Sequence, residues 1–184
     1  MNLKQFLVVF VTGAFSVLAL ASSDDMQQPI HIEADRADID EAKGVMTYTG
    51  NVQLRQGGIE MTADTVVVYS KDGELQRIAA QGTPVHYLQK PLQDAQQKEV
   101  RGVSQRMEYS ASSKLVLLLG KAELWQDGNR FSGNRIQYDP QTERVVANAG
   151  SGADAGQRVS VTIQPKKKKA ASQTGDAQKD SAKP

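Results

Sequence analysis

The fold is decided by GNVQLRQGGIEMTAD, residues 50–64, and by its near-copy GKAELWQDGNRFSGN, residues 120–134. The two stretches align without a gap, so that Leu54 matches Leu124 and Gln56 matches Gln126. On each side of a glycine-containing turn, apolar and polar residues alternate, which is typical of a β-strand with one wet face. The repeat therefore predicts a β-hairpin unit that the chain uses more than once.

A finer repeat extends this unit along the chain. Four hairpins are expected to start at Ala34-Asp35, Ala63-Asp64, Val103-Ser104 and Gly133-Asn134 and to end at Gly50, Gly82, Gly120 and Gly150. Turn sequences rich in Gly, Asp, Asn and Pro separate the strands, and the segment after residue 21 shows no helical period. Stacked hairpins bury a continuous apolar face that none could bury alone. We predict an all-β protein of stacked antiparallel hairpins.

The alternation also predicts which side chains point inward. The repeat supports the assignment, because Met61 aligns with Phe131 and Val66 with Ile136. The expected interior set is Ile30, Ile32, Met46, Tyr48, Val52, Leu54, Ile59, Met61, Val66, Val68, Ile78, Val85, Tyr87, Met107, Tyr109, Leu117, Leu119, Leu124, Phe131, Ile136, Tyr138 and Val146. This interior is either an ordinary packed core or a lining soft enough, with its Met, Leu and Tyr side chains, to accept acyl chains.

The chain divides into three parts. Residues 1–21 have the features of a signal peptide: Lys4, an apolar run over residues 6–20, and small residues at the expected cleavage point. The alternative, a membrane anchor, would need about 20 apolar residues. Residues 22–164 form one domain, and residues 165–184 form a Lys-rich tail too polar to bury a core, which we expect to be disordered.

Charge and cysteine content limit the possible functions. The chain has no cysteine, which excludes disulfides, thiol catalysis and thiolate metal sites. Residues 22–164 carry 19 acidic and 15 basic side chains, so we expect no nucleic-acid partner. The run Lys166–Lys169 is either a solvated terminus or a contact for anionic phosphates or membrane surface.

The sequence contains few candidate catalytic residues. His31 and His86 are the only histidines, and both are expected to point outward. Asp38, Asp40 and Glu41 could form a carboxylate pair or a calcium site, but they fall where a hairpin turn is expected. We expect no catalytic residue, no metal and no organic cofactor, and hence no enzyme. A glycoside hydrolase with two distant carboxylates stays open, because no sequence pattern excludes it.

Three motifs carry a family resemblance: QPIHIEAD at residues 28–35, YTGNV at 48–52 and TADTVVV at 62–68. Together they resemble the OstA-like family over roughly residues 26–164. The resemblance implies an open-ended, twisted β-jellyroll in the periplasm. It also implies a bridge that binds lipopolysaccharide, shelters its acyl chains in an apolar groove and carries it from the inner to the outer membrane.

The resemblance places lipid contacts at Ile30, Ile32, Tyr87 and Tyr109, all members of the expected interior set. From that set we add as candidate lipid-binding residues Leu54, Met61, Met107, Phe131 and Tyr138. The alternatives from other functional classes are a periplasmic carbohydrate-active enzyme and a purely structural β-repeat protein.

An open-ended stack leaves unpaired strand edges, which invite strand addition from another chain. We expect residues 30–34 to form one edge and residues 159–164 the other. The resemblance implies that the first edge meets the inner-membrane-anchored OstA-like partner, LptC. The second edge would meet the N-terminal domain of the outer-membrane translocon, LptD, and unlike edges would also allow head-to-tail self-association.

Overall fold

The computed structural model describes residues 28–91, 98–150 and 158–165. The expected signal peptide, residues 1–21, and the Lys-rich segment from residue 166 lie outside these ranges. Over the described residues the chain forms a sheet of ten antiparallel strands and no helix, as predicted. The strands are β1 (His31–Glu33), β2 (Arg36–Asp40), β3 (Val45–Gln56), β4 (Ile59–Lys71), β5 (Glu74–Gln89), β6 (Val100–Ser110), β7 (Leu115–Gln126), β8 (Asn129–Asp139), β9 (Arg144–Asn148) and β10 (Ser160–Thr162).

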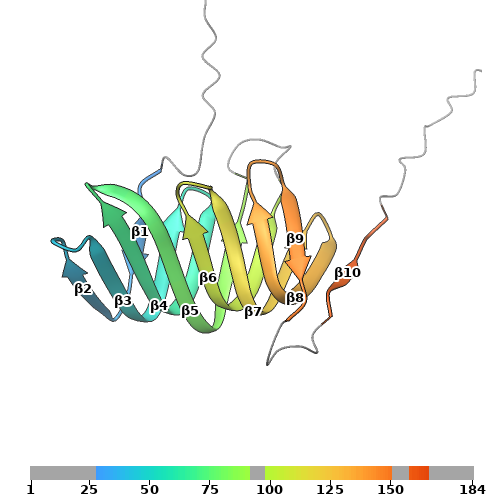
Figure 1. The fold of residues 1–184 in the computed structure, drawn as a ribbon, viewed down its shortest axis with the longest axis horizontal. Coiled ribbons are helices and arrows are strands. Elements are labelled where there is room, and N and C mark those ends of the chain that lie inside the picture. The colour runs from blue at the N-terminus through green and yellow to red at the C-terminus, as the bar shows by residue number, and fades with distance from the viewer. Residues whose placement is uncertain (1–27, 92–97, 151–157, 166–184) are drawn as a thin grey trace, which may run out of the picture.

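Strands adjacent in sequence are also adjacent in the sheet, in the order β3 to β8. The strands follow one another along the molecule and curve round at one side (Figure 1). The expected turns are present between β3 and β4, β4 and β5, β7 and β8, and β8 and β9. Within the described residues, no helix is long and apolar enough to cross a membrane.

Each long strand bends in its middle, and the bends line up across the sheet. The pairing register shifts between Thr49 and Val52 in β3, and corresponding shifts follow in every pair of long strands up to β7 and β8. The residues expected to end the hairpins, such as Gly50 and Gly120, lie at these bends inside continuous strands. That prediction was wrong about strand ends, because a bulge turns a strand without interrupting its pairing.

Backbone conformation explains the glycines at the bend. Gly50 and Gly120 have φ of 83° and 75°, a region that favours glycine. A side chain at Gly50 would collide with Asp35, and one at Gly120 would collide with Gln105. Asp35 is held there by its own amide, which donates to the carbonyl of Gly50 over 3.0 Å.

The bend divides the sheet into two arms that face each other. We call arm A the side of the bend that holds the two short strands β1 and β10. It also contains the C-terminal halves of β3, β5 and β7 and the N-terminal halves of β4, β6 and β8. Arm B has β2, the other halves of β3 to β8, and β9. The expected edges are therefore confirmed as β1 and β10. In arm B, the strands β2 and β9 are also edges, a position that the sequence analysis did not predict for them.

Candidate functional site

The interior of arm A contains an apolar rung of side chains, each directly opposite the next across the strands. The rung runs through Ile32, Leu54, Met61, Tyr87, Gly102, Leu124, Phe131 and Val161. Directly opposed residues share one face of a sheet, so this rung is a continuous apolar line from β1 to β10. Five of the candidate residues from the sequence lie on it.

Arm B contributes two further rungs. The first runs through Met46, Val68, Ile78, Tyr109, Val116, Tyr138 and Val145. The second runs through Tyr48, Val66, Ala80, Met107, Leu118, Ile136 and Ala147. Tyr109, Tyr138 and Met107 thus face the arm A rung, and all three are buried. Ile30, Ile32 and Phe131 are partly buried against the same core.

Two parts of the expected interior were wrong. In β7 the buried residues are Val116 and Leu118, whereas Leu117 and Leu119 are half-buried. The run LVLLL at 115–119 has no alternation, so periodicity cannot choose its face. The repeat could have chosen it, because Val116 aligns with Met46 and Leu118 with Tyr48.

The second correction is in β9. Val145 pairs with Tyr138 and Ala147 with Ile136, so these two residues face the core. Val146 pairs with Gln137 and lies on the other face. The expected position was wrong by one residue because the second hairpin is three residues shorter than the first. Val68 pairs with Ile78, ten positions later, whereas Tyr138 pairs with Val145, seven positions later, and an odd difference reverses the face.

The two arms pack closely together. A cavity between them, lined by residues of both arms including Leu54, Ile78 and Tyr109, has a volume of about 30 Å³. Ligand pockets measure about 300–1,000 Å³, so this cavity is too small for an acyl chain unless the two arms move apart. Gly102 leaves room for Leu118, since a side chain at Gly102 would begin 3.0 Å from the Leu118 Cδ1 atom.

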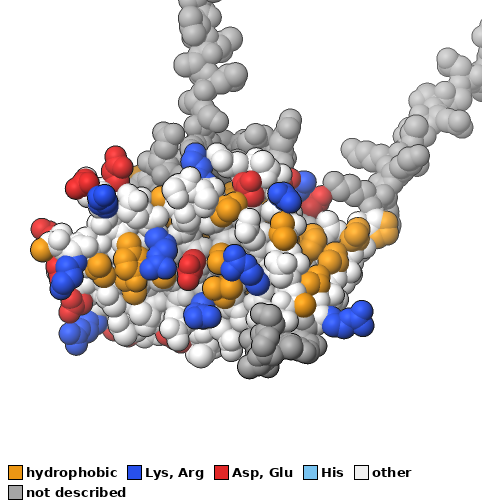
Figure 2. Space-filling model, in the orientation of Figure 1, with side chains coloured by type: hydrophobic (Ala, Val, Ile, Leu, Met, Phe, Trp, Pro, Cys, Tyr) orange, Lys and Arg blue, Asp and Glu red, His pale blue; other side chains and the backbone are white. Residues whose placement is uncertain are grey.

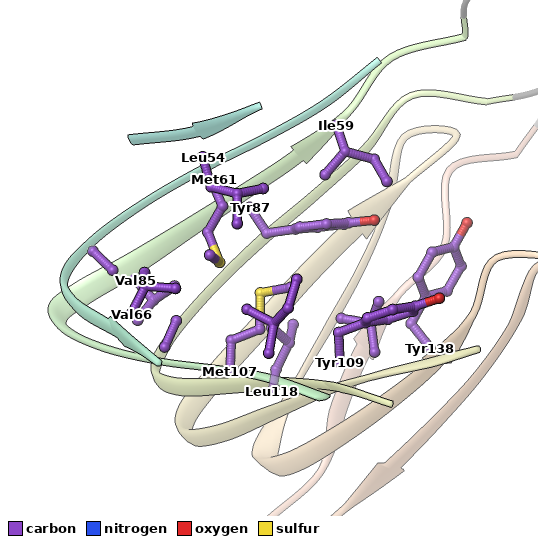
Figure 3. Packing of buried hydrophobic residues seen from close by; sticks show 14 of the residues in the cluster. Leu54, Ile59, Met61, Val66, Val85, Tyr87, Met107, Tyr109, Leu118 and Tyr138 are labelled. Carbon is purple, nitrogen blue, oxygen red and sulfur yellow. The ribbon is translucent and has the colours of Figure 1, made fainter. Parts of the chain in front are cut away.

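Polarity increases from the bend toward the opposite side of the interior. Figure 3 shows Val66 and Val85 near the bend, and the hydroxyl oxygens of Tyr87, Tyr109 and Tyr138 pointing away from it. Burial raises the pKa of Tyr138 to about 12, and the nearby carboxylates of Glu143 and Asp139 add to the effect. The phenol is therefore neutral at physiological pH. We call this side, where the strand-connecting turns lie, the mouth.

An ionic contact crosses the mouth. Lys98, just before β6 in arm A, places its Nζ atom 2.8 Å from Glu143 Oε2 in the turn between β8 and β9 of arm B. The same Nζ lies 4.0 Å from Asp127 Oδ2 in arm A. The hydrogen bond to Glu143 raises the pKa of Lys98. We call the Lys98–Glu143 pair the clasp.

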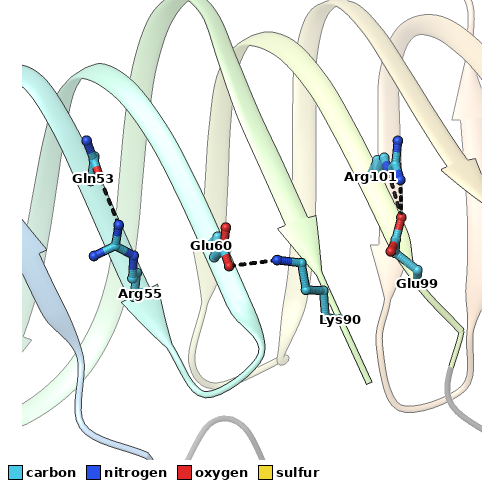
Figure 4. Close-up of polar contacts among 6 residues, drawn as sticks. All are labelled: Gln53, Arg55, Glu60, Lys90, Glu99 and Arg101. Atoms are coloured by element: carbon cyan, nitrogen blue, oxygen red, sulfur yellow. Dashed lines mark hydrogen bonds and ion pairs between the residues drawn. The ribbon is translucent and has the colours of Figure 1, made fainter. Parts of the chain in front are cut away.

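The outer face of arm A is polar and ion-paired. Figure 4 shows Glu60 bound to Lys90 and Glu99 bound to Arg101, at 2.9 and 2.6 Å. A hollow of about 810 Å³ lies over this face and is partly lined by Glu60, Glu99, Arg101 and Trp125. It is larger than the interior cavity, but its paired charges and water-facing strand positions do not suit an acyl chain.

The residues considered for catalysis are dispersed. His31 and His86 are exposed on the outer face, as predicted. Asp40 accepts hydrogen bonds from the backbone and side chain of Lys43 in the turn after β2, which lowers its pKa. Among the described residues, no group of three or more His, Asp or Glu side chains could hold a metal ion.

Comparison with known proteins agrees with this geometry. Residues 31–144 match the family described as LptA/(LptD N-terminal domain) LPS transport protein. The lipopolysaccharide export system protein LptH of Pseudomonas aeruginosa is 35% identical over 88% of this chain and 94% of its own length. The lipopolysaccharide export system protein LptA of Escherichia coli K12 is 36% identical over 83% of this chain and 80% of its own length.

Comparison of the fold with solved structures also finds a lipopolysaccharide transport protein. The crystal structure of LptH from Pseudomonas aeruginosa superposes with a TM-score of 0.69 and 31% identity, covering 77% of this chain and 99% of that one. LptH is the LptA-homologous periplasmic component of the conserved lipopolysaccharide transport device of that organism. The OstA-like resemblance and the jellyroll fold are thereby confirmed. The chain belongs to the LptA/(LptD N-terminal domain) LPS transport protein family.

Proposed function

We propose that this protein is a periplasmic, non-enzymatic carrier that binds lipopolysaccharide and passes it from the inner toward the outer membrane. The observation that carries the proposal is the pair of facing apolar arms, whose rungs run without interruption from the first strands to the last. Exposing one acyl chain of about 12 carbons to water costs on the order of 10 kcal/mol. A continuous apolar path removes that cost along the route.

The acyl chains enter by separation of the arms. Within the described residues, the strands β3 to β8 pass from one arm to the other at the bend, and the clasp joins the arms at the mouth. Parting the arms exposes the candidate lipid-binding residues Ile30, Ile32, Leu54, Met61, Tyr87, Met107, Tyr109, Phe131 and Tyr138 to the chains. The polar sugars remain outside the mouth, where water solvates them.

The strand edges support a role as one link in a bridge. At the C-terminal end, Val161 and Ile163 are 48% and 71% exposed, and hydrophobic side chains gather at that end (Figure 2). An exposed apolar edge strand is a template for strand addition. We propose that β10 with β9 receives an LptD-type N-terminal domain, and that β1 with β2 receives an LptC-type partner. The unlike ends would also pair with each other in head-to-tail copies.

Photocrosslinking tests the proposal. A photoreactive residue at Ile32, which faces inward in β1, should crosslink to lipopolysaccharide, whereas one at the adjacent, outward Glu33 should not. Organic extraction of the purified protein should also release lipid. A purely structural repeat would keep its interior dry, so equal crosslinking at the two positions together with lipid-free extracts would contradict the proposal.

A further inference from the structure

One further rung of arm A is rich in carboxamides. It lies two residues closer to the mouth than the apolar rung and runs through Gln56, Ile59, Gln89, Val100, Gln126 and Asn129, each directly opposite the next. Gln56 and Gln126, which align in the repeat, are both buried in this mainly apolar interior. We call Gln56, Gln89, Gln126 and Asn129 the carboxamide rung.

The rung is hydrogen-bonded at three of its four members. Gln56 Nε2 donates to the carbonyl of Gln28 over 2.9 Å. The hydroxyl of Tyr87 donates to Gln89 Oε1 over 3.0 Å, and the amide of Gln164 donates to Asn129 Oδ1 over 3.0 Å. The fourth member differs: Gln126 is 8% exposed, and its buried Nε2 atom has no acceptor in the part of the chain that the structure describes.

A buried donor without an acceptor is unfavourable, and native proteins rarely keep one without a reason. The amide is neutral, so it suits a neutral acceptor better than a phosphate, which cationic side chains recognise. The nearby cation, Lys98, is engaged in the clasp. The rung also lies between the apolar rung and the mouth, the level at which an acylated lipid changes from hydrocarbon to polar groups.

From these observations we propose that the carboxamide rung binds the ester or amide linkage of an acylated lipid, with Gln126 Nε2 donating to its carbonyl oxygen. The proposal rests on the proposed function, since it assumes that acyl chains enter the interior. It adds a polar recognition element to a site otherwise selective only for hydrocarbon. A carrier with this rung distinguishes acylated lipids from hydrocarbon of equal length.

The test uses two probes that differ only in the carbonyl group: palmitoyl lysophosphatidylcholine, which has an ester, and its hexadecyl ether analogue. Binding of each to the full mature chain is measured by calorimetry below the critical micelle concentration. One additional hydrogen bond should make the ester bind about threefold to tenfold more tightly than the ether. Gln126→Met keeps the side-chain size but removes the donor, so it should abolish this preference.

The matched control is Gln53→Met, because Gln53 is exposed on the outer face of β3 and should not affect the preference. Purified lipopolysaccharide is titrated in parallel. Equal affinity of the unmodified protein for the two probes overturns the inference, as does a preference that survives Gln126→Met. Binding of lipopolysaccharide without binding of either probe also overturns it. If the protein binds none of the three lipids, the proposed function itself is contradicted.

Discussion

Replacing Leu118 by Ala should destabilise the protein far more than the same change at its neighbour Leu117. Leu118 is 1% exposed and lies against Gly102 between the two arms. Loss of a fully buried leucine side chain costs about 2–5 kcal/mol, which includes the cavity left behind. Leu117 is half-buried on the other face of β7, so we expect a loss below about 1 kcal/mol there.

Urea denaturation followed by far-ultraviolet circular dichroism would measure the difference. With a denaturant slope of about 2 kcal/mol per M, Leu118→Ala should lower the unfolding midpoint by roughly 1–2.5 M and Leu117→Ala by less than about 0.5 M. An unchanged slope would show that both variants unfold from the same compact state. Equal midpoint shifts for the two variants would refute the assignment of Leu118 to the interior.

Four other predictions concern lipid handling, pH and assembly. Ile32→Asp should weaken lipopolysaccharide binding without loss of the β-sheet spectrum, because a charge among acyl chains is strongly unfavourable; unchanged affinity in a pull-down would contradict it. Lys98→Met should raise the rate of lipopolysaccharide exchange, because it removes the clasp. High salt should raise this rate in the unmodified protein but not in the variant. Stopped-flow rates that respond to neither change would argue against a clasp. Because folding raises the pKa of Tyr138 from 10.0 to about 12, its neutral form contributes stability below pH 10 that is lost as the pH rises toward 12, and Tyr138→Phe should reduce this alkaline loss in pH-dependent melting. Deleting residues 158–184 should leave a folded protein that no longer self-associates and binds only the LptC-type partner, and growth of mass with concentration in light scattering would oppose the edge-pairing proposal.

The local pattern was enough to predict the strands, the turns and most of the interior. Alternation in segments such as 50–64 requires one face of each strand to be wet, and the repeat required the faces of successive hairpins to agree. Six of the nine candidate lipid-binding residues are buried in the core, and the other three pack against it. These properties depend on neighbours along the chain or directly across a hairpin.

Other features depend on the tertiary structure, because the alternation of apolar and polar residues does not encode them. The apolar run 115–119 has no alternation, so alternation alone leaves its face open, and the pairing with β6 and β8 turns Leu118 rather than Leu117 inward. Lys98 and Glu143 are far apart in the chain and meet only because the bends bring the arm edges together. The sequence suggests only that Gln126 begins a turn. The tertiary structure buries its amide and so removes the water that would otherwise accept its hydrogen bond. Period-two patterning specifies a face for each strand, whereas the bend decides which faces oppose each other and which polar groups lose their water.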